Sequence, residues 1–282
     1  MNSLSAKMGE LRSSVAKLDD ALVAFSGGVD SSLVLKICHD ELKERAIAVT
    51  AVSPSFANNE LENAKKIAEW IGVKHIIVKG TEAEDTNYLK NDMKRCYFCK
   101  SNLYSKLLEV RKEFNFHNIV NGINHDDLKD YRPGIKAAGE YNVISPLRDC
   151  GLGKLEIVEM AKYLSLPNWN KPASPCLSSR VPYGIAINDE ILKKIELAED
   201  FLRSLGLLQF RVRYHNDIAR IEAEKKDFQK VLENSDAIIT KFREIGFRHI
   251  TLDLRGFRSG SLNQRLENVE EENRTLVSRP SS

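Results

Sequence analysis

Residues 21–32 read ALVAFSGGVDSS, which joins a short apolar run to a Ser-Gly-Gly turn and then to a second segment. The run 21–25 is typical of a buried strand, and apolar residues recur at helical spacing through 30–42. Gly27 and Gly28 let the backbone turn tightly and approach a ligand closely. Backbone N–H groups in such a turn converge at the positive end of the following helix dipole. The sequence therefore predicts a strand, a phosphate-binding loop and a helix in immediate succession.

Hydroxyl groups surround this loop. Ser26, Ser31 and Ser32 add hydrogen-bond donors to the backbone N–H groups. The loop differs from the Walker A pattern because the Gly-Lys-Ser/Thr ending is absent. An ordinary strand-to-helix turn, capped by Ser or Asp, is the alternative interpretation of the two glycines alone. The complete seven-residue pattern between a strand and a helix favours a phosphate site.

Strand-like and helix-like segments alternate through the first half of the chain. Strands are expected at 21–25, 46–52, 73–78, 117–121 and 143–146. Helices are expected at 30–42, 59–71, 97–114 and 154–164. Alternation of this kind predicts an α/β fold, a Rossmann-like parallel sheet covered by helices on both faces.

A long Pro- and Ser-rich loop at 167–184 separates this half from a different pattern. The remainder is expected to form a small α+β domain. Its predicted elements are helices at 189–205, 225–233 and 237–244 and strands at 210–214, 218–222 and 248–254. We therefore expect two domains, 1–185 and 186–282.

The composition excludes several classes of protein. Apolar residues make up 42% of the 282 residues, too many for a disordered chain, and 15 Gly with 8 Pro exclude a collagen-like one. The apolar runs are too short to cross a bilayer, and the first residues predict an amphipathic helix rather than a leader, so we expect a cytoplasmic location and no membrane partner. A net charge of +2 argues against a nucleic acid partner.

Three of the five cysteines fall in contexts that suggest chemistry. Cys96 and Cys99 form a Cys-x-x-Cys pair at the start of a helix, and Cys176 lies in the long loop. Such a pair alone is compatible with redox chemistry, zinc or an iron–sulfur cluster, and a structural zinc normally has four ligands. Three thiolates fit a [4Fe–4S] cluster with one iron left open, and three unrelated thiols are the alternative. The helix start and Lys100 are expected to lower the thiol pKa values.

The loop SGGVDSS resembles the pyrophosphate loop of the N-type, or PP-loop, ATP pyrophosphatases, a superfamily that includes NAD and GMP synthetases and tRNA thiolating enzymes. The resemblance implies that ATP is cleaved between its α- and β-phosphates, that AMP is attached to an oxygen of the substrate, and that Asp30 helps to place Mg²⁺. It implies a nucleotide site made of Ala24, Ser26, Gly27, Gly28, Asp30, Ser31, Ser32, Ala51, Lys100, Gly122 and Arg132.

Three further stretches, 168–184, 211–222 and 251–260, resemble the LarE family of sulfur transferases. The resemblance implies adenylation of a carboxylate of pyridinium-3,5-biscarboxylic acid mononucleotide and its conversion to a thiocarboxylate. Some members sacrifice a single cysteine, and others use three cysteines and a [4Fe–4S] cluster. Here the sacrificial position aligns with Pro175, and Cys176 follows it. With Cys96 and Cys99 present, this departure favours the cluster type, with catalytic residues Cys96, Cys99, Cys176 and Asp30.

Family positions near the substrate are matched by Ser179, Arg180, Arg211, Arg213, Glu222 and Arg258. Alternation along a strand places Arg211 and Arg213 on one face, where two guanidinium groups can bind a phosphate. A solvated charged strand is the alternative. The implied partners are a nicotinic-acid-derived mononucleotide and sulfide or another sulfur donor, and the small domain is expected to bind substrate or to assemble a homo-oligomer.

Other functions share the loop. A tRNA thiolating enzyme would share the cysteines as well, although those relatives usually add zinc-ribbon pairs or a basic RNA-binding domain. A non-catalytic ATP-binding regulatory module would hold nucleotide without releasing pyrophosphate. A glutamine- or ammonia-dependent synthetase would leave the cysteines unexplained.

Overall fold

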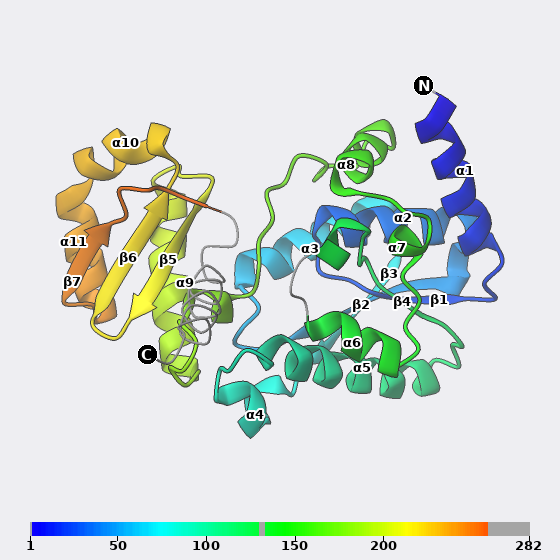
Figure 1. Ribbon diagram of the computed structural model, residues 1–282, viewed down its shortest axis with the longest axis horizontal. Helices are drawn as coiled ribbons and strands as arrows, with labels where there is room; N and C mark the ends of the chain where they lie inside the picture. The colour runs from blue at the N-terminus through cyan, green and yellow to red at the C-terminus, as the bar shows by residue number, and fades with distance from the viewer. Residues whose placement is uncertain (1, 130–132, 259–282) are drawn as a thin grey trace, which may run out of the picture. The chain divides into compact units, whose positions relative to one another are not determined.

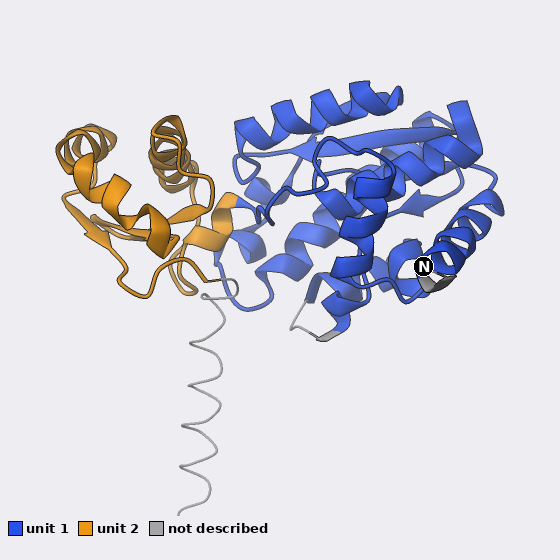
Figure 2. Ribbon diagram, turned by 90° about the horizontal axis from the view of Figure 1, so that it is seen from above, with its two compact units in different colours: residues 1–176 blue, residues 177–282 orange. Residues whose placement is uncertain are grey.

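The computed structural model describes residues 2–129 and 133–258, and the chain divides into two compact units, Met1–Cys176 and Leu177–Ser282 (Figure 2). The sequence placed the boundary near residue 185. The intervening 3₁₀ helix, Leu177–Arg180, belongs to the second unit because the buried Arg180 is ion-paired with Glu199 of that unit.

The first unit contains a four-stranded parallel sheet with the strand order β3-β2-β1-β4 (Figure 1). Its strands are β1 Ala21–Ala24, β2 Ala46–Val52, β3 Lys74–Lys79 and β4 Ile119–Val120. Its helices are α1 Asn2–Ala16, α2 Val29–Leu42, α3 Asn58–Ile71, α4 Thr86–Leu89, α5 Arg95–Glu113, α6 Pro133–Glu140, α7 Pro146–Asp149 and α8 Lys154–Tyr163. The predicted α/β class with a parallel sheet is confirmed.

Alternate residues of the central strands β1 and β2 face two separate cores. Val23 of β1 packs with α2, α3 and α8 on one face, while the neighbouring Leu22 packs with α5 and α6 on the other. Figure 1 shows these two helical layers on opposite sides of the sheet. Within 2–129 and 133–258, no helix has the length and apolar content needed to cross a membrane.

The predicted fifth strand at 143–146 is wrong. Ile144 makes a single parallel bridge to Val120, and the chain then enters α7 at Pro146. Proline supplies no N–H to a sheet and suits the first turn of a helix. Pairing therefore ends after one residue.

The loop after β1 lies where the order of the strands in the sheet changes direction. The chain leaves β1 toward β2 and β3 on one side and then returns to place β4 on the other side of β1, and open α/β sheets bind ligands at such a point. The hydroxyl of Thr50 on β2 donates to the carbonyl oxygen of Phe25 at 2.8 Å, which fixes the end of β1 beside its neighbour.

The second unit is a small α+β fold, as predicted. Its sheet has the order β5-β6-β7, with β5 antiparallel to β6 and β6 parallel to β7. The elements are α9 Asp189–Ser204, β5 Phe210–His215, β6 Ile218–Ala223, α10 Phe228–Glu233, α11 Ser235–Ile245 and β7 His249–Leu252. Phe242 of α11 and Val212 of β5 lie in one fully buried core, which joins the helices to the sheet.

Candidate active site

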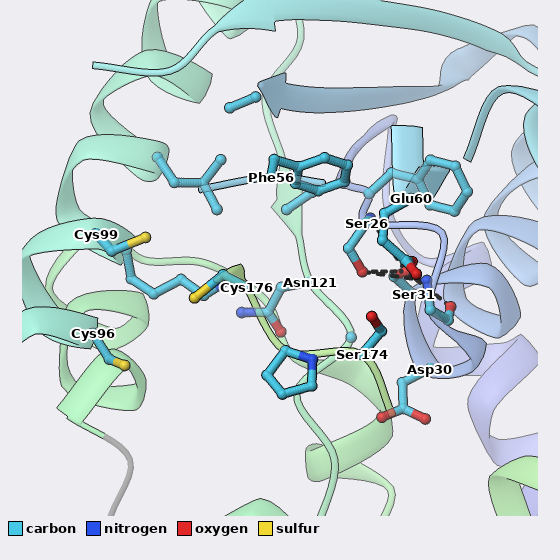
Figure 3. Close-up of a pocket in the computed structure, with 18 of the residues that line it drawn as sticks. Ser26, Asp30, Ser31, Phe56, Glu60, Cys96, Cys99, Asn121, Ser174 and Cys176 are labelled. Carbon is cyan, nitrogen blue, oxygen red and sulfur yellow. Dashed lines mark hydrogen bonds between the residues drawn. The ribbon is translucent and has the colours of Figure 1, made fainter. Parts of the chain in front are cut away.

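A cavity of about 480 Å³ opens in the first unit at the carboxyl ends of the strands. Figure 3 shows Ser26, Asp30 and Ser31 on one side of it, the three cysteines on the other, and Ser174 between them. The residues of the predicted nucleotide and cysteine sites that line it are Ala24, Ser26, Gly28, Asp30, Ser31, Ala51, Cys96, Cys99, Lys100, Gly122 and Cys176. The volume is that of an ordinary ligand pocket.

The loop between β1 and α2 is closed by its own hydroxyl groups. The side-chain oxygens of Ser26 and Ser31 lie 3.1 Å apart, and the Gly28 N–H donates to Ser26 Oγ at 3.4 Å. The Ser31 hydroxyl also lies 3.1 Å from the Gly28 carbonyl oxygen, to which it can donate. The loop therefore presents hydroxyl and backbone donors together at the start of α2, as an anion site requires.

Two glycines are required by close packing around this loop. Gly27 has φ +71°, and a Cβ atom there would lie 2.9 Å from the Cα of Ala64 on α3. A Cβ atom on Gly122, which follows β4, would lie 2.8 Å from the Ser31 backbone nitrogen. Side chains at either position would displace the loop.

Gly27 and Ser32, both predicted to bind nucleotide, contact the protein instead of lining the cavity. Asn168 Nδ2 donates to the Gly27 carbonyl at 3.1 Å and to Ser32 Oγ at 2.9 Å. Lys171 Nζ lies 3.4 Å from the same carbonyl and 2.6 Å from Glu60. Sequence reasoning missed Asn168 and Lys171, although both fall in the 168–184 stretch that carries the family resemblance.

Asp30 is held by two donors from later parts of the chain. Lys154, the first residue of α8, pairs with one carboxylate oxygen, and Asn124 donates to the other at 3.1 Å. Lys154 also lines the cavity, and no sequence pattern marked it as part of the site. Arg132, predicted to bind nucleotide, lies outside the described residues.

Cys96 and Cys99, on α5, and Cys176 point toward a common space in the cavity (Figure 3). Burial raises the pKa of the Cys99 thiol, and the charge of Glu82 and the neighbouring thiols add to this effect. Lys100 lowers the pKa of Cys99, as expected, but its effect is smaller than that of burial. Burial alone would lower the pKa of Lys100, yet Tyr104 and the three thiols raise it, so its ammonium form is favoured beside them.

Among the residues described, no group of three or more His, Cys, Asp or Glu could hold a single metal ion. A [4Fe–4S] cluster is bound differently, because its thiolates attach to different irons and need only face one cavity. Three cysteines around one cavity supply the sulfur donors that such a cluster uses. The Asp30 carboxylate beside the loop supplies an oxygen donor of the kind that Mg²⁺ prefers.

A buried carboxylate lies on the same cavity wall. Glu82 is 8% exposed and accepts hydrogen bonds from the hydroxyl groups of Ser53 and Ser55, the latter at 3.1 Å. These residues follow β2 and β3, and no sequence pattern marked Glu82 as part of the site.

In the second unit, Arg180 and Glu199 form a buried pair. Arg180 Nε and Nη2 donate to the two carboxylate oxygens at 2.8 and 2.9 Å, and Nη1 donates to Ser179 Oγ at 3.0 Å. Glu199 also accepts the Val212 backbone N–H at 3.0 Å. This geometry fixes Ser179 and Arg180 against β5.

Arg213 and Glu222 form a second buried pair across β5 and β6. Arg213 Nε donates to Glu222 at 3.0 Å, and Nη1 donates to the Ser179 carbonyl at 2.5 Å. Arg220 donates to the other Glu222 oxygen at 2.9 Å. Glu222, predicted to bind substrate, therefore neutralises two arginines.

Arg211 differs from its neighbours. It is 6% exposed and, within the described part of the chain, its side chain makes no hydrogen bond or ion pair; its guanidinium lies 4.7 Å from the ring centroid of Phe257. Burial, together with the charges of Arg213 and Arg180, lowers its pKa to about 10. A buried cation without a carboxylate is typical of an anion site. Arg258 Nε is also buried without a hydrogen-bond partner among the described residues.

The chain is similar in sequence to known proteins. Residues 12–96 match the asparagine synthase family. The chain is 37% identical to the pyridinium-3,5-bisthiocarboxylic acid mononucleotide synthase of Lactiplantibacillus plantarum, over 96% of this chain and 98% of that protein. It is 44% identical to an uncharacterised protein of Synechocystis sp., over 93% of this chain and 98% of that protein. It is 35% identical to an uncharacterised protein of Methanocaldococcus jannaschii, over 84% of this chain and 90% of that protein. With its phosphate loop and this full-length similarity, the chain belongs to the LarE family of enzymes within the PP-loop ATP pyrophosphatases.

Proposed function

We propose that this enzyme uses ATP to activate a carboxylate of pyridinium-3,5-biscarboxylic acid mononucleotide and replaces the activated oxygen by sulfur carried on a [4Fe–4S] cluster. The name of the Lactiplantibacillus relative supports the substrate. The observation that carries the proposal is that the phosphate loop and three cysteines line one cavity. Activation and sulfur transfer can then follow one another at a single carbonyl carbon.

In the first step, the loop binds the pyrophosphate part of ATP through the Gly28 N–H and the Ser26 and Ser31 hydroxyls. A substrate carboxylate oxygen attacks the α-phosphorus, and pyrophosphate leaves with the bond electrons. Asp30 would hold Mg²⁺, which when bound would offset the negative charge of the phosphates. Lys154, beside Asp30, adds a positive charge where negative charge develops.

In the second step, AMP leaves with the carboxylate oxygen as sulfur takes its place on the carbonyl carbon. Cys96, Cys99 and Cys176 would hold a [4Fe–4S] cluster, which when bound supplies the transferred sulfur. Lys100 keeps its proton beside the thiols, so its positive charge offsets the negative charge of deprotonated cysteines. The donor set fits the three-cysteine type of the family and supports this assignment.

The second unit is proposed to bind the substrate phosphate. Arg211 supplies a cation that forms no ion pair with the described residues, and Arg213 stands on the same face of β5. Ser179, Arg180, Glu222 and Arg258 complete the proposed substrate set. The ion pairs of Arg180 with Glu199 and of Arg213 with Glu222 fix these side chains in place. Arg211 supplies the positive charge for the phosphate.

The test is product analysis under anaerobic conditions. The chain, reconstituted with iron and sulfide, is incubated with ATP, Mg²⁺ and the mononucleotide, and phosphate products and thiocarboxylate are measured. We expect AMP, pyrophosphate and thiocarboxylate in equal amounts. Cys96→Ala should remove the visible absorbance of the cluster and thiocarboxylate formation, whereas Cys150→Ala should retain both, because Cys150 contacts Ser14 away from the cavity. ADP and orthophosphate as products would contradict the proposal.

A further inference from the structure

We propose that Asn168 and Lys171 are positioning residues that hold the segment 168–176 against the phosphate loop, and so set where the Cys176 thiol lies in the cavity. Their contacts with Gly27 and Ser32 are called the tie below. The proposal rests on the proposed function, in which Cys176 takes part in sulfur transfer. All of the groups involved belong to the first unit.

Asn168 contributes the buried part of this tie. It is 7% exposed, and its Nδ2 donates to Gly27 O and Ser32 Oγ. Because the Gly27 carbonyl only accepts hydrogen bonds, the amide nitrogen must face it. Asn168 Oδ1 is then buried with no hydrogen-bond partner in the described part of the chain. An unpaired buried acceptor is costly, so the residue is placed for the two bonds that it donates.

Lys171 contributes the charged part. Its ammonium group lies 2.6 Å from the Glu60 carboxylate and 3.4 Å from the Gly27 carbonyl oxygen. The Lys171 and Glu60 side chains are 17% and 15% exposed, so water screens this pair less than a surface pair. Gly27 itself is fixed by its close contact with Ala64 of α3. One carbonyl of the phosphate loop thus receives donors from two residues of the segment.

The tie lies a short distance before Cys176. The backbone N–H of Lys171 donates to the Asn168 carbonyl at 3.0 Å, which makes the tied part compact. The connecting residues 172–175, Pro-Ala-Ser-Pro, are all exposed and line the cavity. Five residues reach at most about 18 Å, and the two prolines reduce their freedom further. Figure 3 shows Ser174 between the loop and Cys176. Fixing Lys171 therefore limits how far the Cys176 thiol can move from the phosphate loop.

Cys99 provides an internal reference. It lines the same cavity but lies on α5, which is a separate element of the chain. Loss of the tie should free Cys176 and leave Cys99 unchanged. Lys162 provides a matched control, because its ammonium group lies 5.1 Å from the ring centroid of Trp169. Lys162→Met removes a lysine beside the same segment without touching the phosphate loop.

The experiment measures alkylation of each cysteine by iodoacetamide, followed by mass spectrometry, in the full chain without nucleotide or cluster under anaerobic conditions. In Asn168→Ala and in Lys171→Met, we expect the Cys176 rate to rise about fivefold, the factor that one lost hydrogen bond implies. Cys99 should keep its rate in both variants, and Lys162→Met should behave as the unmodified protein. Lys171→Met keeps the test valid if Asn168→Ala fails to fold.

Kinetic measurements distinguish an effect on the position of Cys176 from an effect on ATP binding. In the reconstituted enzyme we expect both variants to keep the KM for ATP and the rate of AMP formation in the first turnover, and to lose about tenfold in thiocarboxylate formation. Equal acceleration of Cys99 and Cys176 alkylation, or a proportional rise in the KM for ATP, would overturn the proposal. The alkylation experiment requires no reaction, so it still tests the tie if the proposed sulfur transfer fails.

Discussion

The ammonium group of Lys154 is paired with the carboxylate of Asp30 beside the phosphate loop. The pair joins the start of α8 to the start of α2, and Asn124 holds the second Asp30 oxygen at 3.1 Å. Lys154 thereby stands where the phosphates of ATP are proposed to bind. An ion that coordinates Asp30 must share this carboxylate with Lys154 and Asn124.

Lys154→Met should weaken the use of ATP. The substitution removes the cation but keeps most of the side-chain length, and a charge-assisted contact contributes about 1.5–3 kcal/mol, or about 10–150-fold in binding. We expect the KM for ATP to rise within that range while the KM for the mononucleotide stays constant. Steady-state kinetics with each substrate varied in turn provides the measurement. An unchanged KM for ATP would show that Lys154 has no part in nucleotide binding.

Asp30→Asn should remove most turnover and leave the fold intact. The amide is similar in size but cannot provide the negative charge that Mg²⁺ placement needs, and such losses commonly reach about 100-fold or more in rate. Pyrophosphate release measures the effect, and the melting temperature provides the control for folding. Full activity in this variant would move the magnesium site away from Asp30.

Arg211 and Arg213 should differ when each is replaced by alanine. Arg213→Ala removes one of the two arginines that pair with Glu222 in a buried site, so we expect a loss of about 3 kcal/mol in unfolding free energy. Arg211→Ala breaks no ion pair among residues 2–129 and 133–258 and should raise the KM for the mononucleotide about 10–150-fold at a nearly constant melting temperature. Arg211→Lys should recover only part of the affinity, because an ammonium group cannot replace a planar guanidinium.

Both arginine variants are measured by denaturant titration and by kinetics on the same preparations. Equal losses of stability would show that Arg211 is a structural residue. An unchanged KM in both variants would place the substrate phosphate elsewhere.

Asp20 should make the fold sensitive to acid. Burial would raise its pKa, but hydrogen bonds from the backbone of Asn118 and from His117 outweigh burial and lower the pKa below its usual 3.8. The unfolded chain then binds more protons, so this stabilisation is full above pH 3.8 and disappears as the pH falls through the folded-state value. Asp20→Ala should lose about 1.5–3 kcal/mol at pH 7 and progressively less in acid. Denaturant titrations across this range measure the difference, and a constant difference would contradict the assignment.

The spacing of apolar residues and the positions of turn residues were sufficient to predict most of the fold. Leu22 and Val23 are adjacent, both apolar, and face two different cores, which is why a continuous apolar run predicted a strand buried on both sides. The Ser-Gly-Gly turn marked the loop because glycine is required there by backbone conformation and close packing. The run at 143–146 misled because its apolar residues resemble a strand, whereas Pro146 starts a helix.

The site was predicted only where chemistry was visible in residue type. Asn168, Lys171 and Lys154 are ordinary polar residues in sequence, and their roles depend on which carbonyl or carboxylate the fold brings near. The Cys99 pKa could not be predicted for the same reason. Sequence shows the charge of Lys100, but the burial that outweighs it exists only in the folded chain.

The central claim is that sulfur passes through a site held by three cysteines without consuming any of them. Mass spectrometry of the anaerobically reconstituted enzyme, after several turnovers with sulfide, ATP and the mononucleotide, tests it most directly. We predict more than one thiocarboxylate per chain, with Cys96, Cys99 and Cys176 all intact. Dehydroalanine at position 176 that accumulates in step with product, with turnover ending after one transfer, would contradict the account.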